Sequence, residues 1–309
     1  MNAVVEFPTL SMLRTYSQIE FEFDPQLATL FSWMKPTPRP CFNPKMLEEI
    51  QRSERLLELH NGFFNHAGAP ARTDYVVFGS RVPGVFNLGG DLDLFIAAIL
   101  RNDRPLLTNY ARLCIDNQYR RASGFGAEIT TIALVEGKAL GGGFEAALAC
   151  DLIVAERSAT FSLPEMLFNL FPGMGALSFL SRRLGLRKAE EIISSTHVFS
   201  AKEMLELNVV DQVVEDGLGL ESVRYLISSR LRRQNAYRAI QRAKQCVQPI
   251  TRKELDDVVD IWVDAALHLD ATDRRMMARL VRAQDKLVSA SQEDDLLLEE
   301  PAWLTACHG

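Results

Sequence analysis

The chain has 309 residues, 47% of them hydrophobic, and a formal net charge of −6 at pH 7. This is enough apolar material for a large buried core, either as one domain or as a core with an appendage. The negative charge argues against a general nucleic-acid binder, although a local basic stretch could still contact an acidic partner.

The first part of the chain predicts early strands and then a helix. Residues 1 to about 42 mix short apolar and aromatic stretches with the turn-rich segment 36–40. From Asn43 the pattern is helical, because Asn43 can cap a helix, Pro44 fits its first position and apolar residues then recur at helical spacing.

The middle of the chain alternates between strands and helices. Buried strands are expected at 75–78 and 130–135, with a helical stretch at 94–122 between them. Three glycines at 141–143 lead into a helix at 144–150, and short strands follow at 152–155 and 159–162. This alternation predicts an α/β architecture.

Beyond about residue 215 the strand signal stops, and apolar residues follow helical spacing to about residue 287. We therefore divide the chain into a core (1–215), a helical C-terminal region (216–287) and an acidic tail (288–309). The tail reads as irregular from about residue 290, and we expect it to be loosely ordered.

Neither cysteines nor histidines indicate a metal or redox site. The cysteines are odd in number, widely spaced and without a CxxC pair, so we expect reduced and mostly buried thiols. They are Cys41, Cys114, Cys150, Cys246 and Cys307. The histidines form no ligand-spaced cluster, and no cofactor is expected. With no signal-peptide pattern and no long apolar run, we expect a cytoplasmic protein that does not enter the membrane.

The glycines at 141–143 are a candidate anion site. A helix that begins directly after a glycine turn presents unpaired N–H groups at the positive end of its dipole. The alternative is a simple flexible turn. Neither the GxxxxGK[ST] phosphate loop nor the GxGxxG dinucleotide pattern is present, so the turn points away from nucleotides.

Two glutamates stand out beside this turn. Glu145 falls in the first turn of the predicted helix, where a carboxylate could also serve only to stabilise the helix. Glu165 follows Pro164 among apolar neighbours, where burying a carboxylate is costly. Two carboxylates sharing an apolar site separate in proton affinity, so one can act as acid and the other as base in an elimination of water. From spacing alone this is one possible acid/base pair among many carboxylates.

These segments resemble the crotonase (enoyl-CoA hydratase/isomerase) family. The matching motifs are FNLGGD at 86–91, ALGGGFE at 139–145, LPE at 163–165 and FPGM at 171–174. The resemblance implies a crotonase-like spiral of ββα units with a helical C-terminal region. It also implies that the N–H groups of Gly90 and Gly142 form an oxyanion hole for the thioester oxygen, while Asp91 is only a structural member of its loop.

Within that family, the amino-acid sequences of these motifs are similar to those of diffusible signal factor synthases. The segments IWVDAAL at 261–267 and RLVRAQ at 279–284 extend the similarity, so that it runs from about residue 17 to 287. Such synthases are understood to dehydrate 3-hydroxyacyl chains on acyl carrier protein to the cis-2-enoyl form and to release the free acid, a bacterial quorum signal. Both steps can be drawn with Glu165 as the base at carbon 2, Glu145 as the acid toward the 3-hydroxyl and either glutamate later activating water; this order of roles is a hypothesis.

The same resemblance implies a dry pocket for a medium-length acyl tail. It would be lined by Leu140, Phe171, Met174, Trp262 and Leu280, each of which could equally be ordinary core. The coenzyme-A-binding segment is weakly matched at 40–47, so acyl carrier protein is the expected carrier. A basic group could contact that acidic partner or could simply be a solvated helix face; it comprises Arg230, Arg232, Arg233, Arg238, Arg242 and Lys244.

Two alternatives remain open from the sequence. One is a hydratase or isomerase that acts on acyl-CoA in fatty-acid degradation. The other is a crotonase-fold protein that serves as a binding or regulatory module. The presence of both glutamates and both glycine loops argues against it. By family analogy we expect a homo-trimer or hexamer, and a sensor kinase is a possible partner.

Overall fold

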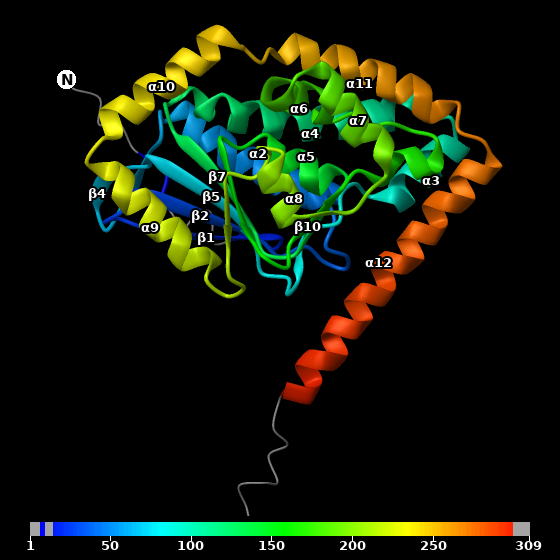
Figure 1. The fold of residues 1–309 in the computed structure, drawn as a ribbon, viewed down its shortest axis with the longest axis horizontal. Coiled ribbons are helices and arrows are strands. Elements are labelled where there is room, and N and C mark those ends of the chain that lie inside the picture. The colour runs from blue at the N-terminus through cyan, green and yellow to red at the C-terminus, as the bar shows by residue number, and fades with distance from the viewer. Residues whose placement is uncertain (1–6, 10–14, 299–309) are drawn as a thin grey trace, which may run out of the picture.

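The computed structural model describes residues 7–9 and 15–298, with side chains up to residue 286. Its main sheet joins segments from the whole core of the chain (Figure 1). The strands lie in the order β1 (Ile19–Asp24), β2 (Thr29–Met34), β5 (Tyr75–Ser80), β7 (Thr130–Val135), β9 (Leu152–Glu156) and β12 (Gln212–Val214). All neighbours are parallel except β1, which is antiparallel to β2.

The main sheet separates two apolar clusters, because side chains alternate between the faces of a strand. On β5, Tyr75 and Val77 join the smaller cluster, which helix α9 (Gly219–Leu231) covers with Val223 and Ile227. Val76 and Phe78 point to the other face and join the large cluster beneath the remaining helices. Strands buried on both faces explain the uninterrupted apolar runs in the sequence.

A second, smaller sheet carries the segments singled out by their motifs. Its order is β11 (Phe199–Ser200), β10 (Thr160–Ser162), β8 (Lys138–Leu140) and β6 (Val85–Asn87). Strands β6, β8 and β10 are parallel. Since parallel strands end at the same edge of a sheet, the three segments that follow them are brought together there. A separate hairpin is formed by β3 (Phe63–His66) and β4 (Ala69–Arg72).

Helix α2 (Pro44–Leu59) begins as predicted, with the Asn43 side chain accepting a hydrogen bond from Met46 N at 2.9 Å. The stretch 94–122 differs from the single helical stretch that we expected. It contains two helices, α3 (Leu92–Leu100) and α4 (Arg104–Ala122). Asn102 takes a left-handed conformation between them, and Asp103 caps α4, so the chain turns at this point.

The remaining helices cover the sheets and form the C-terminal region. They are α5 (Gly142–Leu148), η1 (Gly124–Gly126), η2 (Pro164–Phe168), α6 (Ala176–Leu184), α7 (Leu186–Ser195), α8 (Ala201–Glu206), α10 (Gln234–Val247), α11 (Arg252–Leu267) and α12 (Ala271–Leu298). Helix α12 projects from the body (Figure 1). Its backbone is helical to Leu298, whereas the sequence suggested an irregular tail from about residue 290; residues 299–309 lie outside the described part.

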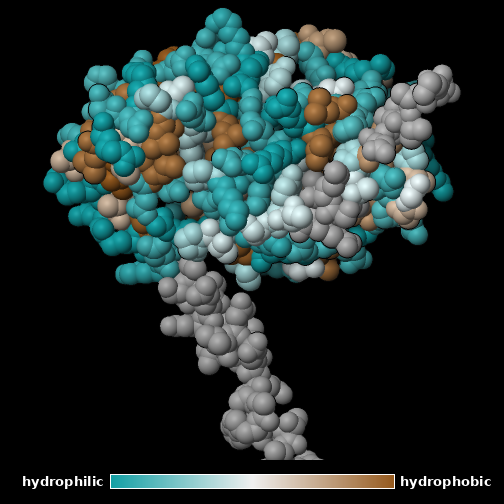
Figure 2. Space-filling view, turned by 180° about the vertical axis from the view of Figure 1, so that it is seen from behind, coloured by the Kyte–Doolittle hydropathy of each residue, from teal (hydrophilic) through white to brown (hydrophobic). Residues whose placement is uncertain are grey.

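The structure confirms the α/β architecture with a helical C-terminal region that the sequence predicted. Seen from behind, the surface is mostly hydrophilic, and apolar side chains gather at the end where α3 lies (Figure 2). Leu100 of α3 is 66% exposed there. Of the helices in the described residues, none combines the length and the apolar character needed to cross a membrane. Cys41, Cys114 and Cys150 are buried free thiols, Cys246 is exposed, and Cys307 lies outside the described residues.

Candidate active site

Two glycine loops meet at the edge of the second sheet. Gly89 and Gly90 follow β6, and Gly141 and Gly142 follow β8. A Cβ placed on Gly142 would lie 3.5 Å from the backbone N of Gly90, so the two N–H groups are close neighbours. Gly142 is the first residue of α5, where the N–H has no partner within the helix. The geometry fits an oxyanion hole made of these two donors.

The positions of these loops require glycine. Gly141 has φ +49°, a left-handed conformation that glycine tolerates best. A Cβ on Gly90 would lie 2.8 Å from the ring of Phe95, and a Cβ on Gly143 only 2.2 Å from the carbonyl oxygen of Asn87. The Asn87 side chain in turn accepts a hydrogen bond from Gly89 N at 2.8 Å. The loops are therefore held by close backbone packing.

Glu145 lies in the first turn of α5 and is 1% exposed. Its Oε1 accepts hydrogen bonds from the backbone N–H groups of Met174, at 2.9 Å, and Ala176, at 3.0 Å. Burial raises the pKa of Glu145 to about 7, while these two hydrogen bonds oppose the rise because they favour the charged carboxylate.

Glu165 lies in η2, directly after β10, and faces the glycine turn. A Cβ on Gly141 would come within 2.6 Å of Glu165 Oε1. Its Oε2 is buried and has no hydrogen-bond partner among the described residues. Burial, and secondarily the charge of Glu145, raises the pKa of Glu165 to about 8.

The arrangement can therefore supply one protonated and one ionised carboxyl near neutral pH. At neutral pH Glu145 is the better place for the negative charge, since two N–H groups of the turn at 174–176 hold its Oε1, whereas Glu165 has only its own backbone N–H and an Oε2 without a partner among the described residues. This resting preference is the reverse of the assignment made from the sequence, which needs a charged Glu165. When the pair holds one proton, the resting form and the form that the sequence assignment needs differ only in which carboxyl carries it.

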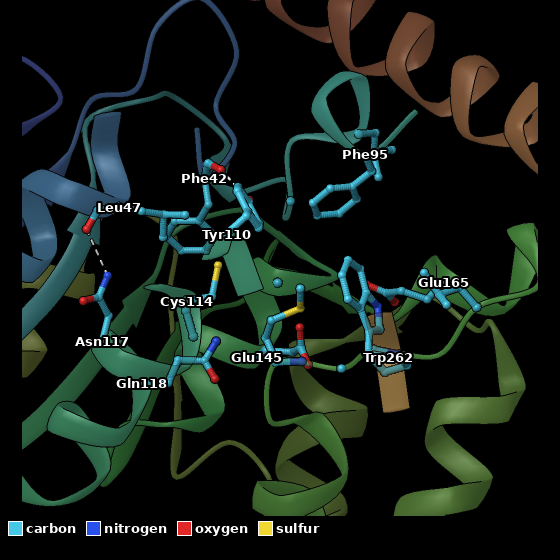
Figure 3. A pocket seen from close by; sticks show the side chains of 18 of the residues that line it. Phe42, Leu47, Phe95, Tyr110, Cys114, Asn117, Gln118, Glu145, Glu165 and Trp262 are labelled. Carbon is cyan, nitrogen blue, oxygen red and sulfur yellow. Dashed lines mark hydrogen bonds between the residues drawn. The ribbon is translucent and has the colours of Figure 1, made fainter. Parts of the chain in front are cut away.

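Both glutamates line a narrow cavity of about 50 Å³, which has room for a few water molecules. Gly90 and Gly142 line it too, so all four predicted residues of the reaction centre come together. Figure 3 shows Glu145 near the middle of the cavity, between side chains of α4 and Trp262. An acyl chain of medium length would need side chains of the wall to move.

The predicted acyl-pocket residues divide into two groups. Met174 and Trp262 line the cavity, whereas Leu140, Phe171 and Leu280 do not. Ala139 points into the core, and the alternation of β8 turns Leu140 to the opposite side.

Phe171 is partly exposed and packs against the core beside its neighbour Pro172, which lines the cavity. Leu280 lies at the rim of the α12 face that buries Met277 and Val281.

Trp262 closes one side of the cavity. It is 2% exposed and stands edge-on to Phe95 with ring centroids 5.2 Å apart. A Cβ on Gly173 would lie 2.3 Å from the indole, so this glycine makes room for the ring. Helix α11 thus contributes directly to the site.

One wall of the cavity was not foreseen. Helix α4 presents Tyr110, Cys114 and Gln118, spaced four residues apart, together with Asn117 and Arg121. This spacing indicates that the residues share one face of the helix. The Tyr110 hydroxyl accepts from Asp91 N at 3.2 Å and donates to Phe42 O at 2.5 Å, which ties α4 to the first glycine loop.

No group of three or more His, Cys, Asp or Glu side chains that could hold a metal ion occurs within the described ranges. Asp91 caps α3 by accepting a hydrogen bond from Leu94 N at 3.2 Å, a structural contact. Within the basic group, Arg238 forms an ion pair with Asp74, and Arg242 lies 3.5 Å from Glu128.

Known enoyl-CoA hydratases are similar to this chain in sequence. The chain is 35% identical over 130 residues to a short-chain-enoyl-CoA hydratase of Clostridioides difficile, covering 42% of this chain and 82% of that protein. It is 32% identical over 185 residues to a probable mitochondrial enoyl-CoA hydratase 2 of Arabidopsis thaliana, covering 59% of this chain and about half (55%) of the relative.

Solved structures share the fold. Pseudomonas aeruginosa DspI superposes with a TM-score of 0.63 at 24% identity, covering 79% of this chain and 95% of DspI. Human mitochondrial delta3-delta2-enoyl-CoA isomerase gives a TM-score of 0.71 at 17% identity, covering 87% and 99%. The sequence model of the enoyl-CoA hydratase/isomerase family matches residues 53–281, most of the chain. The protein therefore belongs to the enoyl-CoA hydratase/isomerase family, the crotonase superfamily of enzymes.

Proposed function

We propose that this enzyme dehydrates a 3-hydroxyacyl thioester to the cis-2-enoyl form and then hydrolyses the thioester to release a free fatty acid of the diffusible signal factor type. The observation that carries the proposal is the pair Glu145 and Glu165 in one cavity with the N–H groups of Gly90 and Gly142. The similarity of its motif segments to diffusible signal factor synthases supports this particular substrate and product.

The first step needs an enolate. The thioester oxygen lies between the N–H groups of Gly90 and Gly142. When carbon 2 loses a proton, negative charge develops on this oxygen, and the two preorganised donors stabilise it. Glu165 Oε1 lies beside Gly141, next to the hole, which suits a base at carbon 2.

Departure of the 3-hydroxyl needs an acid. The turn at 174–176 holds Glu145, and we assign to this glutamate the proton transfer to the 3-hydroxyl. In the reactive form Glu145 carries the proton of the pair and Glu165 carries the negative charge. In the resting form the proton and the charge are exchanged. Proton transfer to the hydroxyl then expels water and leaves the enoyl thioester.

Thioester cleavage can use the same groups. A glutamate that is ionised after dehydration activates water against carbon 1, and the tetrahedral oxyanion occupies the hole of Gly90 and Gly142. The thiol of the carrier leaves and the free acid is formed. No additional catalytic group is required for this second step.

Acyl carrier protein is the proposed carrier. Arg232, Arg233 and Lys244 are exposed and available to an acidic partner, whereas Arg238 is held by Asp74. If the basic side chains attract the carrier, the apparent KM for the acyl carrier protein rises with salt concentration.

Enoyl-CoA hydration is the second candidate function. It is favoured by the similarity to proteins described as enoyl-CoA hydratases, among them 2,3-dehydroadipyl-CoA hydratase of Escherichia coli, to which the chain is 34% identical over 167 residues. The same pair of glutamates can add water to a trans-2-enoyl thioester without cleaving it.

The two candidates give different products. The purified protein is incubated in parallel with 3-hydroxyacyl carrier protein and with trans-2-enoyl-CoA, and the acids and thioesters are separated by mass spectrometry. Release of free cis-2-enoic acid, lost in Glu145→Gln and Glu165→Gln, supports the proposal. Interconversion of acyl-CoA without any free acid would replace it with the hydratase function.

A further inference from the structure

The unforeseen wall of the cavity contains a buried acceptor without a donor. Gln118 of α4 is 4% exposed, lines the cavity, and its Oε1 has no hydrogen-bond partner among the described residues. Leaving a buried amide oxygen unsatisfied costs about 1–3 kcal/mol. Such an atom within a reaction cavity points to a ligand group that donates a hydrogen bond.

The position of Gln118 relates this acceptor to one of the two glutamates. A Cβ on Gly175 would lie 2.8 Å from Gln118 Oε1, so the amide rests against the turn at 174–176. The same turn holds Glu145 through the N–H groups of Met174 and Ala176. Figure 3 shows the Gln118 amide pointing from α4 into the cavity on the side of Glu145.

Other polar side chains of this wall differ from Gln118 in partner or in position. Asn117 Nδ2 donates to Leu47 O at 3.1 Å, which fixes the orientation of its amide. Asn117 also leaves its Oδ1 without a hydrogen-bond partner among the described residues, but Figure 3 shows it beside Leu47, farther from Glu145 than Gln118. Arg121 Nε donates to Glu54 at 2.6 Å in a buried ion pair. Gln118 is therefore the residue of this wall that combines a free acceptor with proximity to Glu145.

We propose that Gln118 Oε1 accepts a hydrogen bond from the 3-hydroxyl of the substrate. Gln118 is then a third polar side chain that contacts the substrate, beside Glu145 and Glu165. The inference rests on the proposed function, because it needs a 3-hydroxyacyl substrate. While the hydroxyl oxygen receives the proton of Glu145, it keeps its own hydrogen, which must be donated to an acceptor in this dry site. Gln118 supplies that acceptor, and water leaves once the carbon 3 to oxygen bond breaks.

The test compares two ligands that differ only in the hydroxyl. They are the 3-hydroxyacyl and the 3-deoxyacyl amides of pantetheine, in which NH replaces the thioester sulfur so that neither is cleaved. Their dissociation constants are measured by calorimetry for the wild-type protein, for Gln118→Met, and for Gln245→Met, the same change at an exposed glutamine of α10.

We expect the wild-type protein and Gln245→Met to bind the hydroxylated amide about tenfold more tightly than the deoxy amide, and Gln118→Met to lose most of this preference. A preference that Gln118→Met retains within about twofold overturns the inference. Tight binding of the deoxy amide by Gln118→Met shows that its cavity is still folded.

The outcome also separates this inference from the proposed function. If the wild-type protein binds both amides equally, Gln118 does not bind the 3-hydroxyl, whatever Gln118→Met does. The proposed release of cis-2-enoic acid is not affected by this result. If the wild-type protein releases no free acid from 3-hydroxyacyl carrier protein, the proposed function fails and takes the inference with it.

Discussion

Glu145 and Glu165 share one cavity but differ in what holds their charge. The two N–H groups at Met174 and Ala176 stabilise a carboxylate on Glu145, whereas Glu165 has only its own backbone N–H. A pair that holds one proton between two such sites can supply an acid and a base at the same pH. Their burial is costly for folding and useful for catalysis.

The pH dependence of activity follows from this pair. Below about pH 7 both carboxyls become protonated and no base remains, and above about pH 8 both are ionised and no acid remains. We expect a bell-shaped profile of kcat/KM with its maximum between these values, and a loss of at least about 100-fold in Glu145→Gln or Glu165→Gln. Initial rates on a 3-hydroxyacyl thioester measure this pH profile. A flat profile across this range contradicts the hypothesis that the two glutamates hold one proton between them.

Stability should depend on pH through Glu165. The folded pKa, about 8, lies above the ordinary value of 4.5, so between these values the unfolded chain ionises while the folded protein stays neutral. Folding stability is therefore lost as pH rises through this window. We expect Glu165→Gln to unfold with a higher free energy than the wild-type protein at pH 8, by at least about 1 kcal/mol, and with no advantage near pH 4.

Urea unfolding at both pH values measures this difference. Glu48→Gln, the same change at an exposed glutamate of α2, is the matched control and should give equal differences at both pH values. A Glu165→Gln protein that is less stable than the wild type at pH 8 would show that the carboxylate is satisfied in the fold.

At the scale of secondary structure, the site depends on how closely α5 packs on β6. A Cβ on Gly143 would meet the carbonyl oxygen and carbon of Asn87 at 2.2 and 2.8 Å, both rigid backbone atoms. Asn87 also holds Gly89, so a displaced α5 would shift the first glycine loop as well. The two donors of the oxyanion hole are thereby linked by one backbone contact.

Gly143→Ala should therefore lower the free energy of unfolding by about 1–3 kcal/mol and reduce kcat. Gly142→Ala is the control for stability, since its Cβ would be 3.5 Å from Gly90 N, an ordinary contact; its cost should stay below about 1 kcal/mol. Equal stability of the two variants in chemical denaturation would show that α5 does not need this contact.

Helices α2 and α4 are joined by a buried ion pair. Arg121 Nε donates to Glu54 Oε1 at 2.6 Å, both side chains are buried, and burial raises the pKa of Glu54 to about 7 despite the arginine. Removing one partner would leave an uncompensated charge next to the cavity.

We expect Arg121→Met to cost about 3–5 kcal/mol of stability, and Arg121→Met combined with Glu54→Leu to cost less than the single change. Denaturant unfolding of both variants measures it. A double variant less stable than Arg121→Met would mean that the pair contributes through packing rather than through charge.

For the molecule as a whole, sequence patterns predicted the strands of the core and the start of α2 because local signals determine them. Apolar runs predict strands buried on both faces, and Asn43 with Pro44 predicts a helix start. The motifs predicted which loops would meet, since Gly90, Gly142 and Glu165 follow three adjacent parallel strands.

Long-range packing was not readable in the same way. The contribution of α4 depends on which face of that helix turns toward the cavity, and Gln118 therefore escaped notice. Whether Leu140 and Leu280 line the cavity depends on the direction of their side chains. Alternation along β8 decides it for Leu140, and the position at the rim of the buried α12 face decides it for Leu280. Trp262, by contrast, lines the cavity. The oligomeric state and the sensor-kinase partner stay predictions.

The C-terminal helices bring the distant parts of the chain to the site. Helix α11 supplies Trp262, and Gln284 of α12 donates a hydrogen bond to Leu88 O at 3.2 Å, directly before the first glycine loop. In the proposed function, the glutamate pair, the oxyanion hole and these C-terminal helices together stabilise negative charge on an acyl thioester.

Exchange of the carbon 2 proton tests that claim most directly. An acyl thioester without the 3-hydroxyl, which cannot be dehydrated, is incubated in D2O with the wild-type protein and with Glu165→Gln, and deuterium at carbon 2 is measured by mass spectrometry. We predict exchange by the wild-type protein and a loss of at least about 100-fold in Glu165→Gln. No exchange by the wild-type protein, or an undiminished rate in Glu165→Gln, would contradict it.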